Sequence, residues 1–248
     1  MMRKIVLFAA LAAATVAPHA VVAQGGPGFL FGRPKVALGF RAGYVVPRIS
    51  GQIFDDARRD YNLNRFDFAT PYLGGEIAVR VSERWDVALN AGWGGSETRS
   101  HYRDWVDADG FEIEQDTRFQ QVTTTLGARY YFADRGRRIG RFAWVPSTLT
   151  PFIGAGAGFA WYELEQAGAF IDFGSPDLEI VGDVVQTSGT GLAGFLSLGA
   201  DLSLGKQFYL TGEVRSVLAG ADAGGQYYLY DGVDLSGLQF ITGISLRW

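Results

Sequence analysis

The last eleven residues of the chain, 238–248, alternate between two kinds of side chain. Every second position from Leu238 is apolar or aromatic except Thr242, whereas the positions between include Gln239 and Arg247. Because successive side chains of a β-strand point to opposite faces, this alternation predicts a strand with one apolar and one polar face. This is the face pattern of a transmembrane β-barrel strand.

The start of the chain has the three parts of a secretory signal peptide. Arg3 and Lys4 precede an apolar run that extends to Ala17, and small residues at 21–23 form a cleavage site before Gln24. We therefore predict an exported protein.

We divide the chain into a signal peptide (1–23), a short N-terminal periplasmic segment (24–35) and one β-barrel (36–248). The sequence has no cysteine, which excludes a disulfide framework, and beyond the signal peptide no stretch approaches the ~20 apolar residues of a membrane helix. The 34 glycines and 14% aromatic residues favour strands and turns over helices. The net charge of −4 argues against a nucleic-acid partner.

Eight segments alternate at period two over about ten residues, the length of a tilted membrane-crossing strand. They are 36–46, 71–81, 85–95, 120–132, 150–162, 191–204, 208–216 and 238–248. The predicted fold is therefore all-β, an eight-stranded antiparallel up-and-down transmembrane β-barrel. A soluble barrel would instead point the same apolar residues inward.

The connections between these segments alternate in length, as they do in outer-membrane barrels. Short turns are predicted at 82–84 and 205–207, and long polar connections at roughly 47–70, 96–118, 164–188 and 217–236. In the second long connection, Asp107–Gly110 predicts a hairpin turn whose flanks extend the third and fourth strands above the membrane.

The connection at 133–148 is long for a periplasmic turn and contains four arginines with Phe142 and Trp144. It either rests its aromatic residues at the inner leaflet, with its arginines on lipid phosphates, or is a solvated basic loop.

The glycine-laced strand at 150–159, TPFIGAGAGF, and the terminal alternation together resemble the small outer-membrane β-barrel family, the OmpA-like and OmpW-like barrels. The resemblance covers the whole mature chain and implies an outer-membrane location. It also implies outer-membrane lipids and lipopolysaccharide as surroundings, and the barrel-assembly machinery and periplasmic chaperones as partners during biogenesis. The family usually ends in Phe. The residues that the machinery would read here are Phe240, Ile244, Leu246 and Trp248.

Aromatic residues fall at the predicted strand ends, where they would form two interfacial belts. The periplasmic belt is predicted to contain Trp85, Tyr130, Phe132, Phe208 and Trp248, and the outer belt Tyr44, Trp93 and Trp161.

Nine charged residues occupy inward positions with nearly balanced charge. They are Arg41, Glu76, Arg80, Asp86, Arg129, Asp201, Glu213, Arg215 and Arg247. Because buried ions are costly unless paired, we expect ladders of arginine–carboxylate bridges across neighbouring strands. Such a network either plugs the barrel or forms a gate for small solutes, and the many inward glycines would leave space inside.

No catalytic residue, metal ligand or cofactor site is predicted. Only His101 remains after signal cleavage, and an enzyme would need it within hydrogen-bond reach of a serine or carboxylate. The aspartates of the first two long connections lack the spacing of a calcium loop.

The long connections carry many aromatic residues, which either anchor an unknown extracellular ligand, pack on one another or touch the outer leaflet. They are Phe54, Tyr61, Phe66, Tyr102, Trp105, Phe111, Tyr227, Tyr228 and Tyr230. The predicted function is that of a non-enzymatic outer-membrane barrel supporting membrane integrity or surface interaction. The alternatives are a narrow channel for small or hydrophobic solutes and, more remotely, a lipid-modifying enzyme.

Overall fold

The computed structural model describes residues 28–48, 50, 55, 58–64, 66–222 and 232–248. The predicted signal peptide lies outside the described residues. So do Phe54, Tyr227, Tyr228 and Tyr230 of the long connections.

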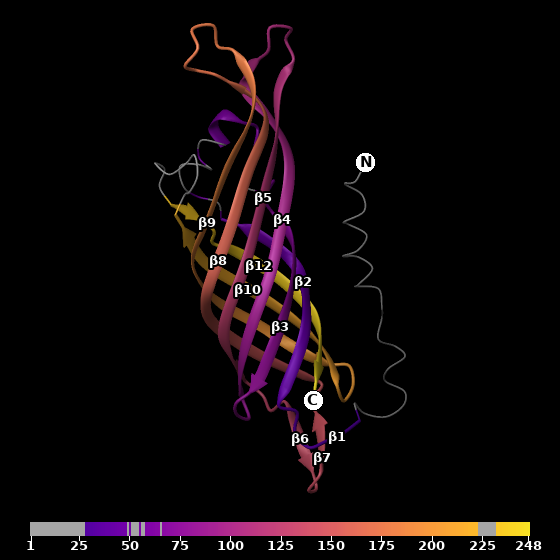
Figure 1. Cartoon of the computed structure of the whole chain (residues 1–248). Coiled ribbons are helices and arrows are strands. Elements are labelled where there is room, and N and C mark those ends of the chain that lie inside the picture. The colour runs from indigo at the N-terminus through magenta and orange to yellow at the C-terminus, as the bar shows by residue number, and fades with distance from the viewer. Residues whose placement is uncertain (1–27, 49, 51–54, 56–57, 65, 223–231) are drawn as a thin grey trace.

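In the described part of the chain, eight antiparallel strands close into a ring in the order β12-β2-β3-β4-β5-β8-β9-β10, because β10 pairs with both β9 and β12 (Figure 1). The strands are β2 (Val36–Pro47), β3 (Thr70–Arg80), β4 (Trp85–Val106), β5 (Glu112–Tyr131), β8 (Leu149–Ile171), β9 (Ile180–Ser203), β10 (Phe208–Ala221) and β12 (Gly237–Arg247). Strands that follow one another along the chain lie side by side, so the predicted up-and-down barrel is confirmed.

The outer surface of the ring is apolar. In β10, exposed residues such as Leu210, Val214 and Leu218 alternate with buried residues such as Glu213 and Arg215 along the whole strand. An exposed apolar belt of this kind is stable against lipid and not against water, and closure of the ring leaves every backbone group of the belt paired. No helix among the described residues is long and apolar enough to cross a membrane.

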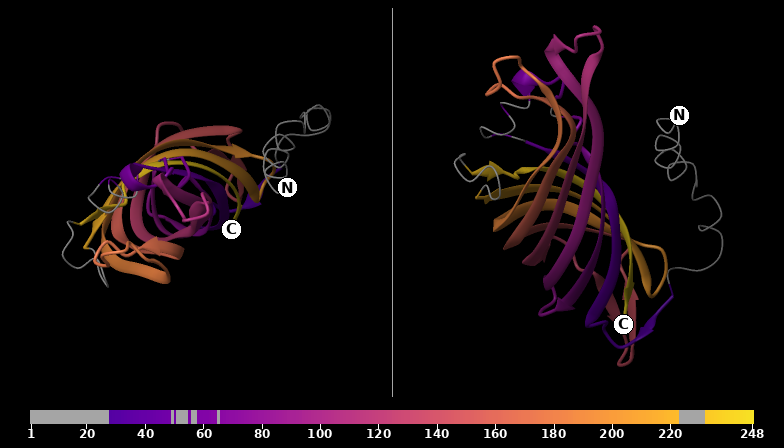
Figure 2. Two further views of the ribbon diagram at one scale, coloured as in Figure 1. Left: turned by 90° about the horizontal axis from the view of Figure 1, so that it is seen from above. Right: turned by 45° about the horizontal axis from the view of Figure 1, so that its top comes forward.

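Four adjacent strands are much longer than the membrane requires. β4, β5, β8 and β9 have 22, 20, 23 and 24 residues, and they rise past the other strands as two hairpins (Figures 1 and 2). The interpretation of 164–188 as a long polar connection is therefore wrong, because β8 and β9 remain paired as far as Ile171 and Ile180. Beyond the lipid, outward positions such as Glu97 and Arg99 of β4 and Asp116 of β5 are charged, so the hydrophobic alternation is interrupted although the strands continue.

The predicted hairpin turn at Asp107–Gly110 is confirmed. The Asp107 carboxylate accepts a hydrogen bond from the backbone nitrogen of Phe111 at 2.7 Å, and the Gly110 nitrogen donates to the Asp107 carbonyl at 3.0 Å. Gly110 has a φ of +86°, in the left-handed region that favours glycine.

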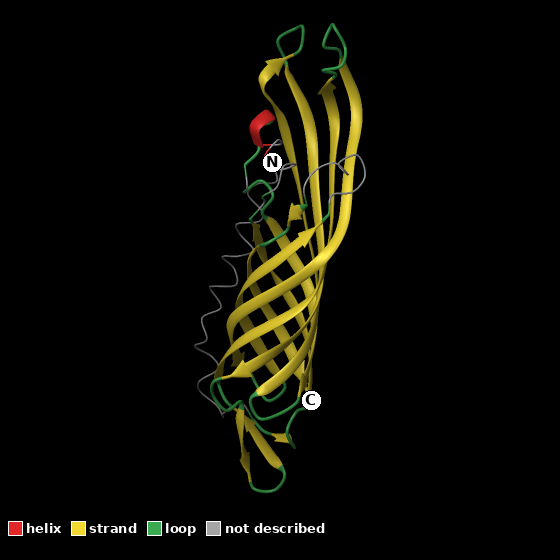
Figure 3. Ribbon diagram, turned by 90° about the vertical axis from the view of Figure 1, so that its left-hand side faces the viewer, coloured by secondary structure: helices red, strands yellow, loops and turns green. Residues whose placement is uncertain are grey.

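A small three-stranded sheet lies beyond the other end of the barrel, near the C-terminus (Figure 3). It consists of β1 (Leu30–Phe31), β6 (Gly136–Ile139) and β7 (Ala143–Pro146) in the order β1-β7-β6. The short turns lie at this end, which makes it the periplasmic end. β11 (Val233–Asp234), at the opposite end, pairs with the last residues of β10.

Aromatic rings inside the barrel pack against inward-facing glycines. A Cβ added at Gly156 would come within 2.5 Å of the Phe195 ring and 2.6 Å of the Gly127 backbone, and one added at Gly199 within 2.5 Å of the Phe152 ring. The space beside Gly156 and Gly199 is therefore not open, because rings from neighbouring positions fill it.

We expect Gly156→Ala to destabilise the barrel by about 1–3 kcal/mol, because the new methyl group meets backbone on one side and a packed ring on the other. Urea unfolding of the protein in detergent micelles would measure the loss. Gly212→Ala is the matched control, since a Cβ there has no atom within 4 Å. Equal stability of the two variants would contradict the close packing of ring on glycine.

Candidate functional site in the barrel lumen

A carboxylate near the middle of the lumen is held by arginines from two strands. Glu76 of β3 accepts hydrogen bonds from Arg41 of β2 and from Arg129 of β5, each at 2.7 Å. A second nitrogen of Arg129 bonds the other oxygen of Glu76, so this contact is bidentate. All three side chains are buried.

The same arginine continues the network across the lumen. Arg129 lies 3.2 Å from Glu213 of β10, which also binds Arg215 at 3.0 Å. Arg215 in turn donates to the Asn90 amide oxygen at 3.4 Å. We call Arg41, Glu76, Arg129, Glu213 and Arg215 the central cluster. Because two carboxylates are surrounded by three guanidinium groups, every charge in the central cluster has an opposite neighbour, as burial requires.

The central cluster differs from the expected ladders between neighbouring strands. Only Arg41 and Glu76 lie on adjacent strands, whereas Glu76 and Arg129 are separated by β4 and Arg129 reaches Glu213 across the lumen. The expectation is therefore corrected. The network spans the lumen from β3 through β5 to β10 and does not run along neighbouring strands.

Two of the arginines also stack on the aromatic rings that pack against the inward-facing glycines. The guanidinium carbon of Arg129 lies 4.8 Å from the centre of the Phe152 ring, and that of Arg215 lies 4.4 Å from the Phe195 ring. Each ring thus contacts both a glycine and a cation.

Asp201 has hydroxyl partners in place of an arginine. Its two oxygens accept hydrogen bonds from Tyr131 at 2.9 Å and Thr211 at 2.7 Å. No arginine among the described residues lies within ion-pair distance of it.

Asp86, Arg80 and Arg247 lie at the periplasmic mouth with two residues that the lumen prediction omitted. Asp86 pairs with Arg135 of the 133–148 connection, although Arg80 is its direct neighbour across β3 and β4. The Trp144 ring lies between the guanidinium groups of Arg80 and Arg247, at 5.6 and 5.4 Å. Trp144 is 2% exposed.

The connection at 133–148 therefore closes the mouth. Both interpretations of this connection are corrected for Trp144, which is buried, and for Arg135, which is half-buried against Asp86. The remaining arginines, with Phe142, are exposed. The signal available in the sequence was the length of the connection itself, since a periplasmic turn needs only a few residues.

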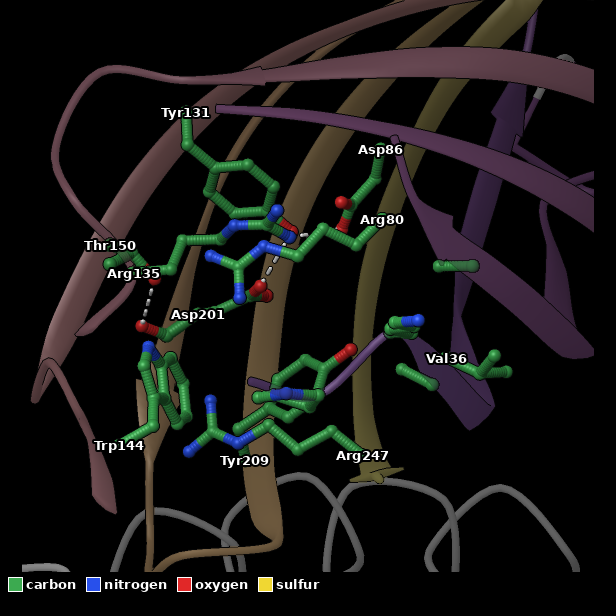
Figure 4. A pocket seen from close by; sticks show the side chains of 14 residues that line it. Val36, Arg80, Asp86, Tyr131, Arg135, Trp144, Thr150, Asp201, Tyr209 and Arg247 are labelled. Atoms are coloured by element: carbon green, nitrogen blue, oxygen red, sulfur yellow. Dashed lines mark hydrogen bonds and ion pairs between the residues drawn. The ribbon is translucent and has the colours of Figure 1, made fainter. Parts of the chain in front are cut away.

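A cavity of about 40 Å³ lies at this mouth, lined by Trp144 and Asp201 among others, and Figure 4 shows Arg80, Asp86 and Arg135 meeting in it. That volume holds about two water molecules. It is too small for an organic solute.

The predicted belt residues all lie on the outer surface, exposed or half-buried. At the periplasmic end Tyr130 contacts Trp85, with ring centres 5.1 Å apart, and Phe132, at 5.7 Å. At the opposite end Trp93 donates to the Gln120 side chain at 3.4 Å. The other belt residues are Tyr44, Trp161, Phe208 and Trp248. Of the predicted assembly signal, Phe240, Ile244 and Trp248 are exposed and Leu246 is half-buried.

His101 lies within reach of a carboxylate, the condition set for an enzyme, since its Nδ1 is 3.3 Å from Glu112. The neighbouring Ser100 is buried on the opposite face of β4, where its hydroxyl approaches the Gln115 carbonyl at 3.4 Å. Ser100 therefore does not lie beside the His101–Glu112 pair. No group of three or more potential ligands among the described residues could hold a metal ion.

We expect Glu76→Gln to destabilise the barrel by about 3–5 kcal/mol, because it leaves buried guanidinium groups without their shared carboxylate. Glu97→Gln is the control, since Glu97 pairs with Arg118 on the exposed surface and its loss should cost less than about 1 kcal/mol. Unfolding in urea, followed by electrophoretic mobility of the folded form, measures both. Similar losses in the two variants would contradict the central role of Glu76.

No family model matches the sequence, and no curated protein sequence matches it either. Among solved structures the chain is similar to Neisserial surface protein A, with 11% identity and a TM-score of 0.48 over 91% of this chain and 100% of that one. The chain is also similar to the outer membrane protein OprG of Pseudomonas aeruginosa, with 16% identity and a TM-score of 0.46 over 88% of this chain and 99% of that one. A third similar structure is that of Ail, the attachment invasion locus protein of Yersinia pestis, with 13% identity and a TM-score of 0.44 over 86% of this chain and 99% of that one. With its closed ring of eight strands and its exposed apolar belt, this chain has the architecture of an outer-membrane β-barrel.

Proposed function

We propose that this barrel is non-enzymatic, closed to solutes, and interacts at the cell surface through its two long hairpins. The observation that carries the proposal is the sheet that β4, β5, β8 and β9 form beyond the membrane. We call residues 96–118 and 163–188 the wall. It continues as one antiparallel sheet, because β5 and β8 remain paired as far as Gln115 and Gly168.

The outer face of the wall is built for water. Arg99 pairs with Asp116 at 3.2 Å and Arg118 with Glu97 at 3.3 Å, all with exposed side chains. Pairs of this kind add little stability, but they keep the sheet soluble outside the lipid. The inner face combines an apolar cluster of Tyr102, Ile113 and Ile171 with buried polar residues such as Gln115 and Gln166.

The two edges of the wall differ. The chain at 61–62 covers the β4 edge, where the Asn62 nitrogen donates to the His101 carbonyl at 3.1 Å and Arg103 donates to the Tyr61 carbonyl at 2.6 Å. On the β9 edge, pairing with β10 ends at Ala193, and in the described part of the chain no strand pairs with the other side of residues 180–186.

An open strand edge is a template for another extended chain. Val181 and Val184 of this edge are 40% and 55% exposed, which supplies apolar side chains for a partner strand. We infer that an extended segment of a surface partner adds to the wall at β9.

The lumen supports closure better than conduction. The central cluster crosses the lumen, the rings of Tyr72, Phe152 and Phe195 are buried inside it, and Trp144 covers the periplasmic mouth. We expect no discrete openings from the wild type in planar bilayers. Arg41→Ala with Arg129→Ala should also stay silent, because the three rings remain. Openings in wild-type protein that the double variant alters would favour the channel alternative.

The edge proposal is tested by panning a phage-displayed peptide library on the folded protein in micelles. We expect enriched peptides with alternating apolar residues, and a tenfold or greater loss of binding to a Val181→Lys, Val184→Lys variant. Charges on an edge strand oppose pairing. Val106→Lys is the control, since Val106 is an equally exposed valine, at 58%, on the other hairpin of the wall. Equal binding to all three proteins would contradict pairing at β9.

A further inference from the structure

A cavity of about 300 Å³ lies at the extracellular side of the wall, between the end of β4, the turn after β8 and the chain at residues 60–61. Its volume is at the lower end of the range for small-molecule sites. Five of its lining residues are aromatic: Tyr61, Tyr102, Trp105, Phe170 and Phe173. Neither the barrel nor the open edge of β9 depends on this cavity.

A β-bulge turns the β4 side chains toward the cavity. His101 pairs with Glu114, and the next pair is Val106 with Glu112, so five steps along β4 match only two steps along β5. The three extra residues break the alternation of the strand, as bulges do. Asp104 and Trp105 can therefore both line the cavity although they are neighbours in sequence.

The aromatic residues are arranged in two pairs. Tyr61 and Tyr102 have ring centres 4.7 Å apart and hydroxyl oxygens 3.2 Å apart. Trp105 and Phe173 have ring centres 5.8 Å apart and planes at 75°. The edge-to-face pair fixes the direction of the Trp105 ring without covering both of its faces.

Two carboxylates stand among these rings. Asp60 is paired with Arg59 at 2.9 Å, whereas Asp104 has no ion-pair partner among the described residues. The nearby Arg103 donates to the Tyr61 carbonyl. Among the described residues, no lysine, arginine or histidine lines the cavity, and its two lining carboxylates give it a negative charge.

We propose that this cavity binds an organic cation with an alkylated ammonium group. Aromatic faces attract such cations through the negative potential of their rings, and the methyl groups of the cation lose little hydration on entering an apolar cavity. Asp104 supplies a counter-charge at the rim. An anion would meet carboxylates and ring faces, both of which repel it.

The probe is choline, titrated by calorimetry into the full-length folded protein in octyl glucoside, a detergent without an ammonium headgroup. The matched ligand is 3,3-dimethylbutan-1-ol, which has the shape of choline and no charge. We expect saturable choline binding and at least tenfold weaker binding of the alcohol. Equal binding of the two would overturn the proposal, and so would the absence of saturable choline binding.

Three variants test the residues, each shown to be folded by its electrophoretic mobility. We expect Asp104→Asn and Trp105→Ala each to weaken choline binding roughly 3- to 30-fold. Asp109→Asn removes the same charge from the β4–β5 turn outside the cavity and should change binding less than about twofold. If Asp109→Asn weakens binding as much as Asp104→Asn, the attraction is diffuse and the site is overturned.

Phosphocholine distinguishes the two sources of such a group. Binding at least as tight as that of choline supports a site for lipid or glycan headgroups that carry phosphocholine. Weaker binding supports a site for the free cation, because the phosphate then meets Asp60 or Asp104.

Discussion

The bidentate contact between Glu76 and Arg129 is the interaction on which the interior of this barrel depends. It joins β3 to β5 past the intervening β4, and through Glu213 it reaches the far side of the ring. A buried carboxylate is tolerated only with its full set of partners. Separating the residues of the central cluster would leave buried charges unpaired. This cost stabilises the ring geometry that brings them together.

The rings and glycines of the lumen follow from the same constraint. A guanidinium group buried in a narrow barrel needs a surface as well as a counter-ion, and the Phe152 and Phe195 rings provide it. Those rings fit only because Gly156 and Gly199 have no side chain in their place. The resulting interior resembles a packed core more than a pore, so the surface that we propose for function lies beyond the membrane.

The sequence predicts the membrane part of the fold well and the rest poorly, for physical reasons. Lipid on one side imposes a strict alternation, so all eight crossing strands could be located, as β10 shows. Beyond the lipid, a residue such as Asp116 is as acceptable on the outer face as an apolar one was below, so the continuation of the strands leaves no periodic signal. Contacts across the lumen depend on strand stagger, which does not appear in one strand. Arg135 could not be placed, because the hairpin that carries it folds back under the barrel.

The closure of the periplasmic mouth also has a consequence for the order of assembly. Trp144 lies between Arg80 on β3 and Arg247, the penultimate residue of the chain. Arg247 lies on β12, and the pairing of β12 with β2 is the one that joins the first and last strands of the ring. Trp144 can therefore contact both arginines only when the ring is closed, and its full set of contacts marks a completed barrel.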